Sequence, residues 1–236
     1  MEGHREVELH AEFSLTTKRL KHDDYSELAL KHFGETEDNR YGYIKTFHDK
    51  LVHCAPELLK EIPGNRDDFL LKFLRAANFD VDQACHVMKN YVNMITSGPQ
   101  YFTPAFEEGM ETIKAGFRTL NFSILPSRDK FKRRVYIWRP GMWNPNQMSL
   151  GEFYSCGYAM WEMISVEEES QIAGLTVVCD ATDFGFQQLR NISIADIKYL
   201  AMFVQVGGLC TTLKIAVKGM LFLFFVTFIG PFPSLD

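Results

Sequence analysis

The chain has 236 residues, and its 25 basic and 30 acidic side chains give a net charge of -5. With 46% hydrophobic and 23% charged residues it is neither disordered nor fibrous, and it is long enough for one large or two small domains. The acidic balance argues against a nucleic-acid-binding protein, which needs a basic stripe. The 20 Phe, 9 Tyr and 3 Trp exceed what a core of this size requires and favour a lined cavity as well.

Cysteine and histidine positions weigh against metal and nucleophilic chemistry. The five cysteines include no C-x-x-C pair, so we expect reduced thiols rather than a disulfide framework or a zinc site. All seven histidines lie in the first 86 residues, and His48 and His53 with Asp49 and Glu57 make a poor ligand set. We expect no enzyme, no cofactor and no metal. The polar N-terminus has no apolar run typical of a secretory signal, which favours a cytoplasmic protein.

Helical patterns dominate the first part of the chain. Residues 1–34 are charged and mixed, and we expect a weakly ordered arm with some helix. Across residues 35–98, apolar side chains recur every three to four positions in three stretches, which predicts three amphipathic helices. The second stretch ends at Asn78 and Asp80 can cap the third, so these two form an αα-hairpin that must bury its apolar stripe against another element.

After residue 115 the pattern changes to strands alternating with helices. Residues 134–139 and 175–180 are short, apolar and β-prone. Residues 149–166 and the stretch that Ser193 can cap have helical spacing instead. This alternation predicts α/β packing.

The last residues, 206–236, do not continue this alternation, and we expect a divergent apolar tail. Its apolar stretch from Met220 to Ile229 is too short for a bilayer core, which needs about 20 residues, and Lys214 and Lys218 interrupt any longer count. A truncated or mispredicted chain end would explain this tail.

Four motifs carry a resemblance to a known family. Residues 67–84, DDFLLKFLRAANFDVDQA, resemble the N-terminal helical signature of CRAL-TRIO proteins. Residues 125–129 (LPSRD) and 133–143 (RRVYIWRPGMW) resemble the first strand and loop of the lipid-binding domain, and residues 174–180 (GLTVVCD) resemble its central strand. The motifs occur in the family's order over roughly residues 35–205, and they are most similar to the tocopherol-transfer, clavesin and retinaldehyde-binding group.

The resemblance implies an α/β fold in which an N-terminal helical subdomain, residues 35–98, precedes an incomplete lipid-binding domain, residues 115–205. Members of the family hold one small lipid in an apolar cavity above the sheet, move it between membranes and are not enzymes. The implied partners are a small hydrophobic lipid and a phosphoinositide-containing membrane, and the implied location is cytoplasmic, peripheral to endosomal membranes. The resemblance ends at Gln205, so the family's later strand, gate helix and basic face are not expected.

Matching the chain to the family pattern also suggests ligand-binding residues, which simple core packing would explain equally well. Strand alternation puts Tyr136 and Trp138 on one face. Arg75 fits an arginine of the family's N-terminal helix and is expected either to bind a phosphoinositide or to pair with a helix carboxylate. The expected ligand-binding residues are Tyr136, Trp138, Tyr154, Tyr158, Trp161, Val177, Cys179, Leu200 and Phe203.

Four functions are therefore weighed. The first is binding and intracellular transfer of a small hydrophobic lipid of the tocopherol, retinoid or phospholipid class. The second is a phosphoinositide-dependent membrane adaptor. The third, a cytosolic enzyme acting through the N-terminal histidines, is disfavoured by their poor ligand set, and the fourth is a non-functional truncated product. Solvent extraction of the purified protein separates the first two, because only a carrier yields a bound lipid.

Overall fold

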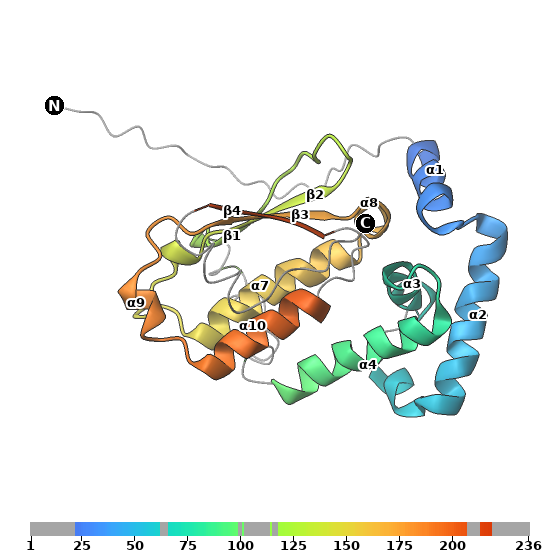
Figure 1. Cartoon of the computed structure of the whole chain (residues 1–236), viewed down its shortest axis with the longest axis horizontal. Coiled ribbons are helices and arrows are strands. Elements are labelled where there is room, and N and C mark those ends of the chain that lie inside the picture. Colours follow the sequence, from blue (N-terminus) through green and yellow to red (C-terminus); the bar gives the residue numbers. More distant parts are fainter. Residues whose placement is uncertain are drawn as a thin grey trace.

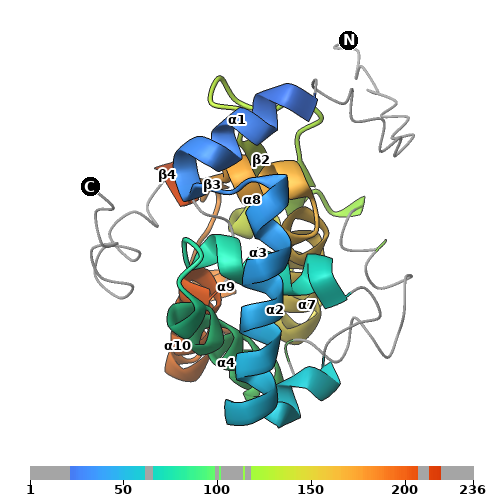
Figure 2. The same ribbon diagram turned by 90° about the vertical axis from the view of Figure 1, so that its right-hand side faces the viewer.

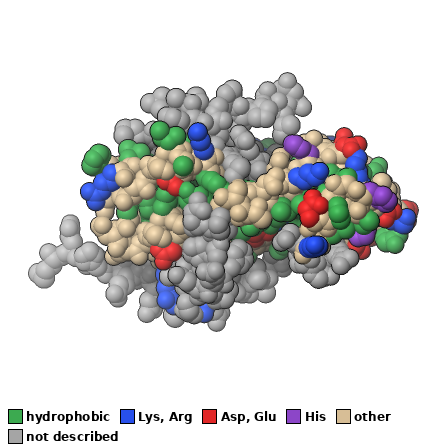
Figure 3. Space-filling model, turned by 90° about the horizontal axis from the view of Figure 1, so that it is seen from below, with side chains coloured by type: hydrophobic (Ala, Val, Ile, Leu, Met, Phe, Trp, Pro, Cys, Tyr) green, Lys and Arg blue, Asp and Glu red, His purple; other side chains and the backbone are tan. Residues whose placement is uncertain are grey.

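The computed structural model describes residues 22–61, 66–98, 101, 114, 118–206 and 213–218. Helices α1 to α4 lie on one side of the molecule, and a four-stranded sheet with α7 and α10 beneath it lies on the other (Figure 1). Seen from the side of the N-terminal helices, α1 and α2 run one after the other in front of the sheet and α7 (Figure 2). The histidine side chains visible from below all lie over these N-terminal helices (Figure 3).

The N-terminal helices begin and end where the sequence supplies caps. Thr36 and Asn39 form a reciprocal capping box with bonds of 2.9 and 3.2 Å at the start of α2. Asp80 accepts from the backbone of Gln83 at 2.9 Å and begins α4. Between α3 and α4, Asn78 turns the chain with a φ of 49°. The elements are α1 (His22–Phe33), α2 (Glu37–Cys54), the 3₁₀ helix η1 (Pro56–Glu61), α3 (Arg66–Ala76) and α4 (Val81–Ser97).

The apolar stripes of α2, α3 and α4 meet in one core. Phe47, Leu51, Phe73, Leu74 and Met88 all have an exposed fraction of 0%. The stripes predicted from the spacing of apolar residues are thus the buried faces of these helices. The sequence-predicted helical subdomain is confirmed as a helical unit.

The sheet is small and mixed. Its order is β1-β2-β3-β4, with β1 antiparallel to β2 and the other neighbours parallel. Tyr136 pairs with Val177 and Trp138 pairs with Cys179, so these four side chains share one face of the sheet. The strands are β1 (Phe122–Ile124), β2 (Arg134–Trp138), β3 (Leu175–Asp180) and β4 (Leu213–Lys218).

Helix α7 (Leu150–Ser165) covers that face. It begins at a capping box formed by Ser149 and Glu152. At Gly157 an added Cβ would lie 3.0 Å from the Phe122 ring, so any other residue would require that ring to shift by a few tenths of an ångström. The remaining elements are the 3₁₀ helix η2 (Pro140–Met142), α8 (Glu168–Ala173), α9 (Phe186–Leu189) and α10 (Ile194–Val206).

The predicted fold class is confirmed, because a helical subdomain precedes an α/β unit with a small mixed sheet. Two parts of the chain differ from the sequence expectation. Helix α1 lies in the expected arm, yet its Tyr25 and Ala29 are buried against Ile172 and Ala173. Strand β4 lies in the expected tail and pairs with β3 along six positions. The arm before residue 22 and the tail after residue 218 lie outside the described residues.

Candidate functional site

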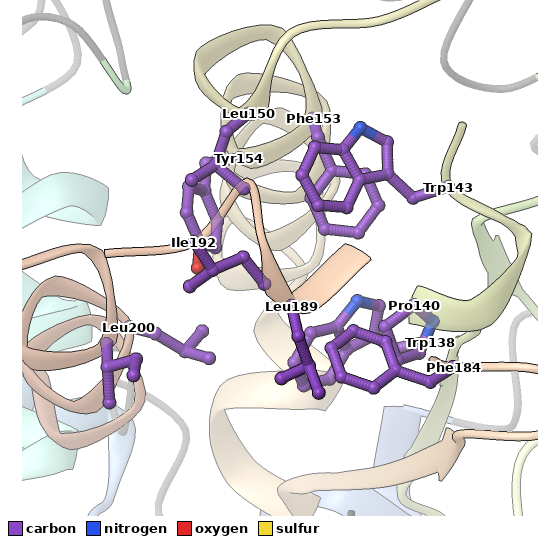
Figure 4. Close-up of a pocket in the computed structure, with 11 residues that line it drawn as sticks. Trp138, Pro140, Trp143, Leu150, Phe153, Tyr154, Phe184, Leu189, Ile192 and Leu200 are labelled. Atoms are coloured by element: carbon purple, nitrogen blue, oxygen red, sulfur yellow. The ribbon is translucent and has the colours of Figure 1, made fainter. Parts of the chain in front are cut away.

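A hollow opens between the end of β2, the start of α7, and helices α9 and α10. Figure 4 shows side chains from these elements converging on one space, with Leu200 reaching in from α10 and Trp143 and Phe153 lying next to each other on the opposite side. The residues that line it are Trp138, Pro140, Trp143, Leu150, Phe153, Tyr154, Phe184, Leu189, Ile192, Ile197 and Leu200.

The lining of the hollow is aromatic and aliphatic. The Trp143 and Phe153 rings lie 5.2 Å apart at 31°, and Trp143 donates its indole N–H to the carbonyl of Met148 at 2.9 Å. That polar atom is therefore satisfied by the backbone rather than available to a ligand. The cavity volume of the hollow is about 50 Å³. It can hold small molecules as it stands, but a larger guest requires the walls to separate.

Among the described residues, Gln188 joins helix α9 to the loop that follows β2. Gln188 donates from its amide to the carbonyls of Gly141 at 3.3 Å and Trp143 at 2.9 Å. Outside this anchor, several large apolar residues of the same region face solvent. We call these residues the apolar rim: Met142 (49% exposed), Phe186 (79%), Leu189 (45%) and Ile194 (72%). The rim places exposed apolar surface beside an apolar hollow.

Of the nine sequence-predicted ligand residues, the structure brings Trp138, Tyr154 and Leu200 together in the hollow. Phe203 lies on α10, but its side chain is outside the described residues. The other five are buried in packed cores. Tyr136, Trp161 and Val177 lie between the sheet and α7, Cys179 is buried on β3, and Tyr158 packs against the N-terminal helices. A ligand role for all nine residues stays a prediction.

Burial disfavours ionisation of Tyr136 on β2 and Cys179 on β3. Burial, with a smaller effect of the neighbouring Asp180 charge, raises the pKa of the Cys179 thiol to about 12. Burial also raises the pKa of Tyr136 well above its ordinary value, with Cys156 and Cys179 adding to the effect. Both groups stay protonated near neutral pH. The described part of the chain also contains no group of three or more His, Cys, Asp or Glu side chains placed to hold a metal.

Sequence reasoning missed most of the hollow's lining. Phe184, Leu189 and Ile192 come from the connection that follows β3, and Trp143 comes from the connection that follows β2. One available signal would have pointed to both segments, since ligands of open α/β sheets bind beyond the carboxyl ends of the strands. Applied to 134–139 and 175–180, that rule selects the segments on which these residues lie.

Arg75 is sealed inside the molecule. Its exposed fraction is 1%, and it forms a bidentate pair with Glu35 at 2.7 and 2.9 Å. It also donates to Gln171 and Glu168, each at 2.7 Å. Burial alone would lower the pKa of Arg75, but the hydrogen bonds and charges of Glu35 and Glu168 outweigh it and raise that pKa. The geometry supports pairing with carboxylates, and a membrane phosphate has no route to this side chain.

A second buried cation lies one turn earlier on α3. Lys72 is 1% exposed, pairs with Glu162 of α7 at 3.3 Å and lies 4.4–5.2 Å from the centroids of three aromatic rings. Beside Lys72, the hydroxyls of Tyr91 and Tyr158 form a hydrogen bond of 3.0 Å. Burial, followed by the Glu162 charge, raises the pKa of both phenols. We call the set Glu35, Lys72, Arg75, Tyr91, Tyr158, Glu162, Glu168 and Gln171 the polar seam, because it joins the N-terminal helices to α7 and α8.

Three arginines in and beside the β1–β2 connection pair with carboxylates. Arg128 and Arg134 both reach Glu167, at 2.9 and 2.8 Å. Arg133 pairs with Asp129 at 2.6 Å. One pair thus lies within the connection and two join it to the start of α8, so these arginines do not form a free basic cluster. In the described part of the chain, no helix combines the length and apolar character needed to cross a bilayer.

Two family profiles match the chain in the order expected. The CRAL/TRIO N-terminal domain matches residues 30–90, and the CRAL/TRIO domain matches residues 118–213. The second match reaches eight residues beyond Gln205, where the resemblance was expected to end. Together the two matches cover about two thirds of the chain, and they include β1 to β3 and every residue that lines the hollow.

Proteins from several animals are similar to the chain in sequence. The alpha-tocopherol transfer protein-like protein of Mus musculus is 31% identical over 163 residues, covering 59% of this chain and 46% of its own length. The Homo sapiens protein of that name is 32% identical with the same coverage. Clavesin-1 of Xenopus laevis is 23% identical over 130 residues, covering 54% of this chain and 38% of its own. The chain spans about half the length of these relatives, and with both domain profiles in sequence it belongs to the CRAL-TRIO family.

Proposed function

We propose that the chain binds a small hydrophobic lipid of the tocopherol, retinoid or phospholipid class in the hollow and transfers it between membranes inside the cell. The observation that carries this proposal is the lining itself, eleven side chains without a single charged group. Burying an alkyl chain against such walls is worth about 0.8 kcal/mol per CH₂. Binding of this kind forms and breaks no covalent bond, so the proposed role is not enzymatic.

The hollow is too small to hold a lipid without a change in structure. Ligand pockets commonly have roughly 300–1,000 Å³, several times the about 50 Å³ found here. A lipid of any of the three classes therefore requires α9 or α10 to move outward. Helix α9 is suited to this because it is four residues long and Gln188 supplies its described side-chain bonds to the loop at Gly141 and Trp143. The apolar rim beside it would meet the membrane during loading.

Filling the hollow tests the proposal. Leu200→Trp adds an indole inside the lining, and Val166→Trp adds the same ring at a 69% exposed position at the far end of α7. Lipids are extracted from each purified full-length protein and identified by mass spectrometry. We expect a bound lipid in the wild type and in Val166→Trp, and at least a tenfold lower amount in Leu200→Trp. Equal lipid content in all three proteins would overturn the assignment of the hollow.

The adaptor alternative has lost its expected residue, because Arg75 is buried in the polar seam. A phosphoinositide-containing membrane, endosomal or otherwise, remains a proposed partner through another surface. Vesicles of phosphatidylcholine with and without phosphoinositide, mixed with lipid-extracted protein, separate the two roles. Phosphoinositide-dependent sedimentation of a protein that never carries an extractable lipid would favour the adaptor.

A further inference from the structure

One hydroxyl lies among the apolar walls of the hollow. Of the eleven described side chains that line it, only Tyr154 of α7 carries an O–H group. The ring of Tyr154 is held edge-on against Tyr101, with centroids 5.3 Å apart at 86°, and lies 5.9 Å from the ring of Phe153. No hydrogen bond joins the Tyr154 hydroxyl to any described residue. In Figure 4 its oxygen points away from α7 toward Ile192, so a fixed ring presents an unused polar group to the hollow.

The Tyr154 hydroxyl is a hydrogen-bond donor near neutral pH. Burial, followed by the charge of Asp196 and the neighbouring Tyr101, raises the pKa of the Tyr154 phenol, so the phenol stays protonated. A hydroxyl kept away from water without a partner is unfavourable, and a ligand oxygen that accepts its hydrogen bond removes this cost. A pure hydrocarbon cannot supply that oxygen.

The lining has nothing to balance a charged headgroup. None of the described lining side chains is a cation. A carboxylate lies beside the hollow instead, because Asp196 of α10 accepts from the hydroxyl of Tyr101, the ring that packs against Tyr154. Burial acts to raise the pKa of Asp196, but the hydrogen bonds from Ser193 and Tyr101 outweigh it, so Asp196 is charged near neutral pH. An anionic headgroup would lose its water without gaining a counterion, and it would lie near a like charge.

From this placement we infer that Tyr154 selects the ligand by donating a hydrogen bond to an uncharged oxygen, so that the hollow takes a lipid with one hydroxyl or carbonyl group on a hydrocarbon skeleton. This assignment rests on the proposed function, because it names the ligand class of the same hollow. Helix α7 is packed against the sheet, so the Tyr154 hydroxyl keeps its place while α9 or α10 moves to admit the lipid. Of the three proposed classes, phospholipids fit least, because their headgroup brings a charged phosphate with it.

Two fluorescent probes with the same polyene test this selection. Retinol ends in a hydroxyl, and axerophthene is the same molecule with hydrogen in place of that hydroxyl. Dissociation constants of both probes are measured by fluorescence titration of the full chain and of Tyr154→Phe, which keeps the ring and removes the hydroxyl. A net hydrogen bond to the ligand corresponds to about a two- to tenfold change in affinity. We expect Tyr154→Phe to weaken retinol binding by this factor and to bind axerophthene as tightly as the wild type, which also shows that the variant is folded.

Tyr41→Phe is the matched control, because Tyr41 is 68% exposed on α2, and it should leave both constants unchanged. The same ratio of the two constants in the wild type and in Tyr154→Phe would overturn the inference, as would loss of both probes in Tyr154→Phe, since the hydroxyl would then be structural. Displacement of retinol by an equimolar amount of a short-chain phosphatidylcholine would overturn the uncharged ligand class. A wild type that binds neither probe also overturns the inference, whereas the proposed function fails only if no lipid can be extracted from the protein either.

Discussion

Helix α7 contacts two kinds of surroundings along its length. Near its start, Phe153 and Tyr154 face the hollow, where the neighbours are aromatic or aliphatic and space remains between them. Toward its end, Tyr158 and Glu162 face α3 and α4, where Lys72 meets the Glu162 carboxylate and the Tyr91 ring. Tyr154 and Tyr158 are one turn apart on the same side of the helix, yet one lines a cavity and the other closes an interface.

The comparison shows that aromatic content alone does not identify a ligand site. In the polar seam, tyrosine hydroxyls and buried cations satisfy one another, so the rings are held in fixed positions and no guest can displace them without leaving a charge unpaired. The walls of the hollow contain few polar groups that need a hydrogen-bond partner. A hydrophobic ligand that enters it therefore displaces only weak apolar contacts. We therefore expect mutations in the polar seam to change the stability of the protein, and mutations in the hollow to change ligand binding.

The largest effect on stability is expected from a mutation of Arg75 in the polar seam. Replacing Arg75 with alanine leaves the Glu35 carboxylate, whose side chain is 1% exposed, without its bidentate partner. Removing one member of a buried ion pair costs about 3–5 kcal/mol, so we expect the free energy of unfolding in urea to fall by that amount.

Arg40→Ala is the control, because Arg40 contacts the same Glu35 and Glu168 but is 33% exposed. It should cost less than about 1 kcal/mol. If Arg75→Ala were no more harmful than Arg40→Ala, while phosphoinositide vesicles bound the wild type and not Arg75→Ala, the buried pairing would be wrong and the membrane role of Arg75 would return.

A smaller effect is expected at Tyr158, where the two regions can be told apart directly. Tyr158→Phe removes the hydroxyl that meets Tyr91 and leaves the ring in place. Loss of one buried hydrogen bond costs about 1 kcal/mol. We expect this loss of unfolding free energy with no change in the lipid extracted from the protein.

A double-mutant cycle with Tyr91→Phe sharpens the test, because two residues that share one bond should show a coupling of about 0.5–1 kcal/mol. A Tyr158→Phe protein of unchanged stability that had lost its lipid would place Tyr158 in the ligand site instead. That outcome would extend the hollow along α7 into what we describe as the seam.

Local sequence signals predicted the elements with an uninterrupted apolar pattern and missed strands β1 and β4. The β-branched run at 175–180 matches β3, and the cap at Asp80 begins α4. Strand β1 has three residues, too few for any period to show. Strand β4 carries Lys214 and Lys218, which interrupt the apolar pattern that predicts a buried strand. Short or interrupted segments become strands through their neighbours in the sheet, which a single-sequence pattern does not contain.

The site was predicted only in part for a similar reason. Spacing on α7 correctly places Tyr154 and Tyr158 on one side of the helix, but it does not reveal that Tyr158 contacts Tyr91 of α4 while Tyr154 lines the hollow. The partners of Arg75, Glu35 and Glu168, are 40 and 93 residues away along the chain. Contacts of that range follow from the tertiary arrangement, so the choice between a membrane phosphate and a carboxylate needed the fold.

The smallest expected effect lies on the hollow side, at the carboxylate that anchors α10. Asp196 accepts from the Ser193 backbone at 2.6 Å and from the Tyr101 hydroxyl. Burial acts to raise the pKa of Asp196, but the bonds from Ser193 and Tyr101 outweigh it and lower that pKa. Folding thus favours the charged form of Asp196. The contribution of this charge to the free energy of unfolding is complete above about pH 4, the pKa in the unfolded chain, and is lost as the pH falls through the lowered pKa of the folded protein.

Asp196→Asn should cost about 0.5 kcal/mol at pH 7 and still less at pH 3. Urea unfolding at both pH values, with the 55% exposed Asp49→Asn as control, checks this, and an equal cost at both would show that the charge contributes nothing.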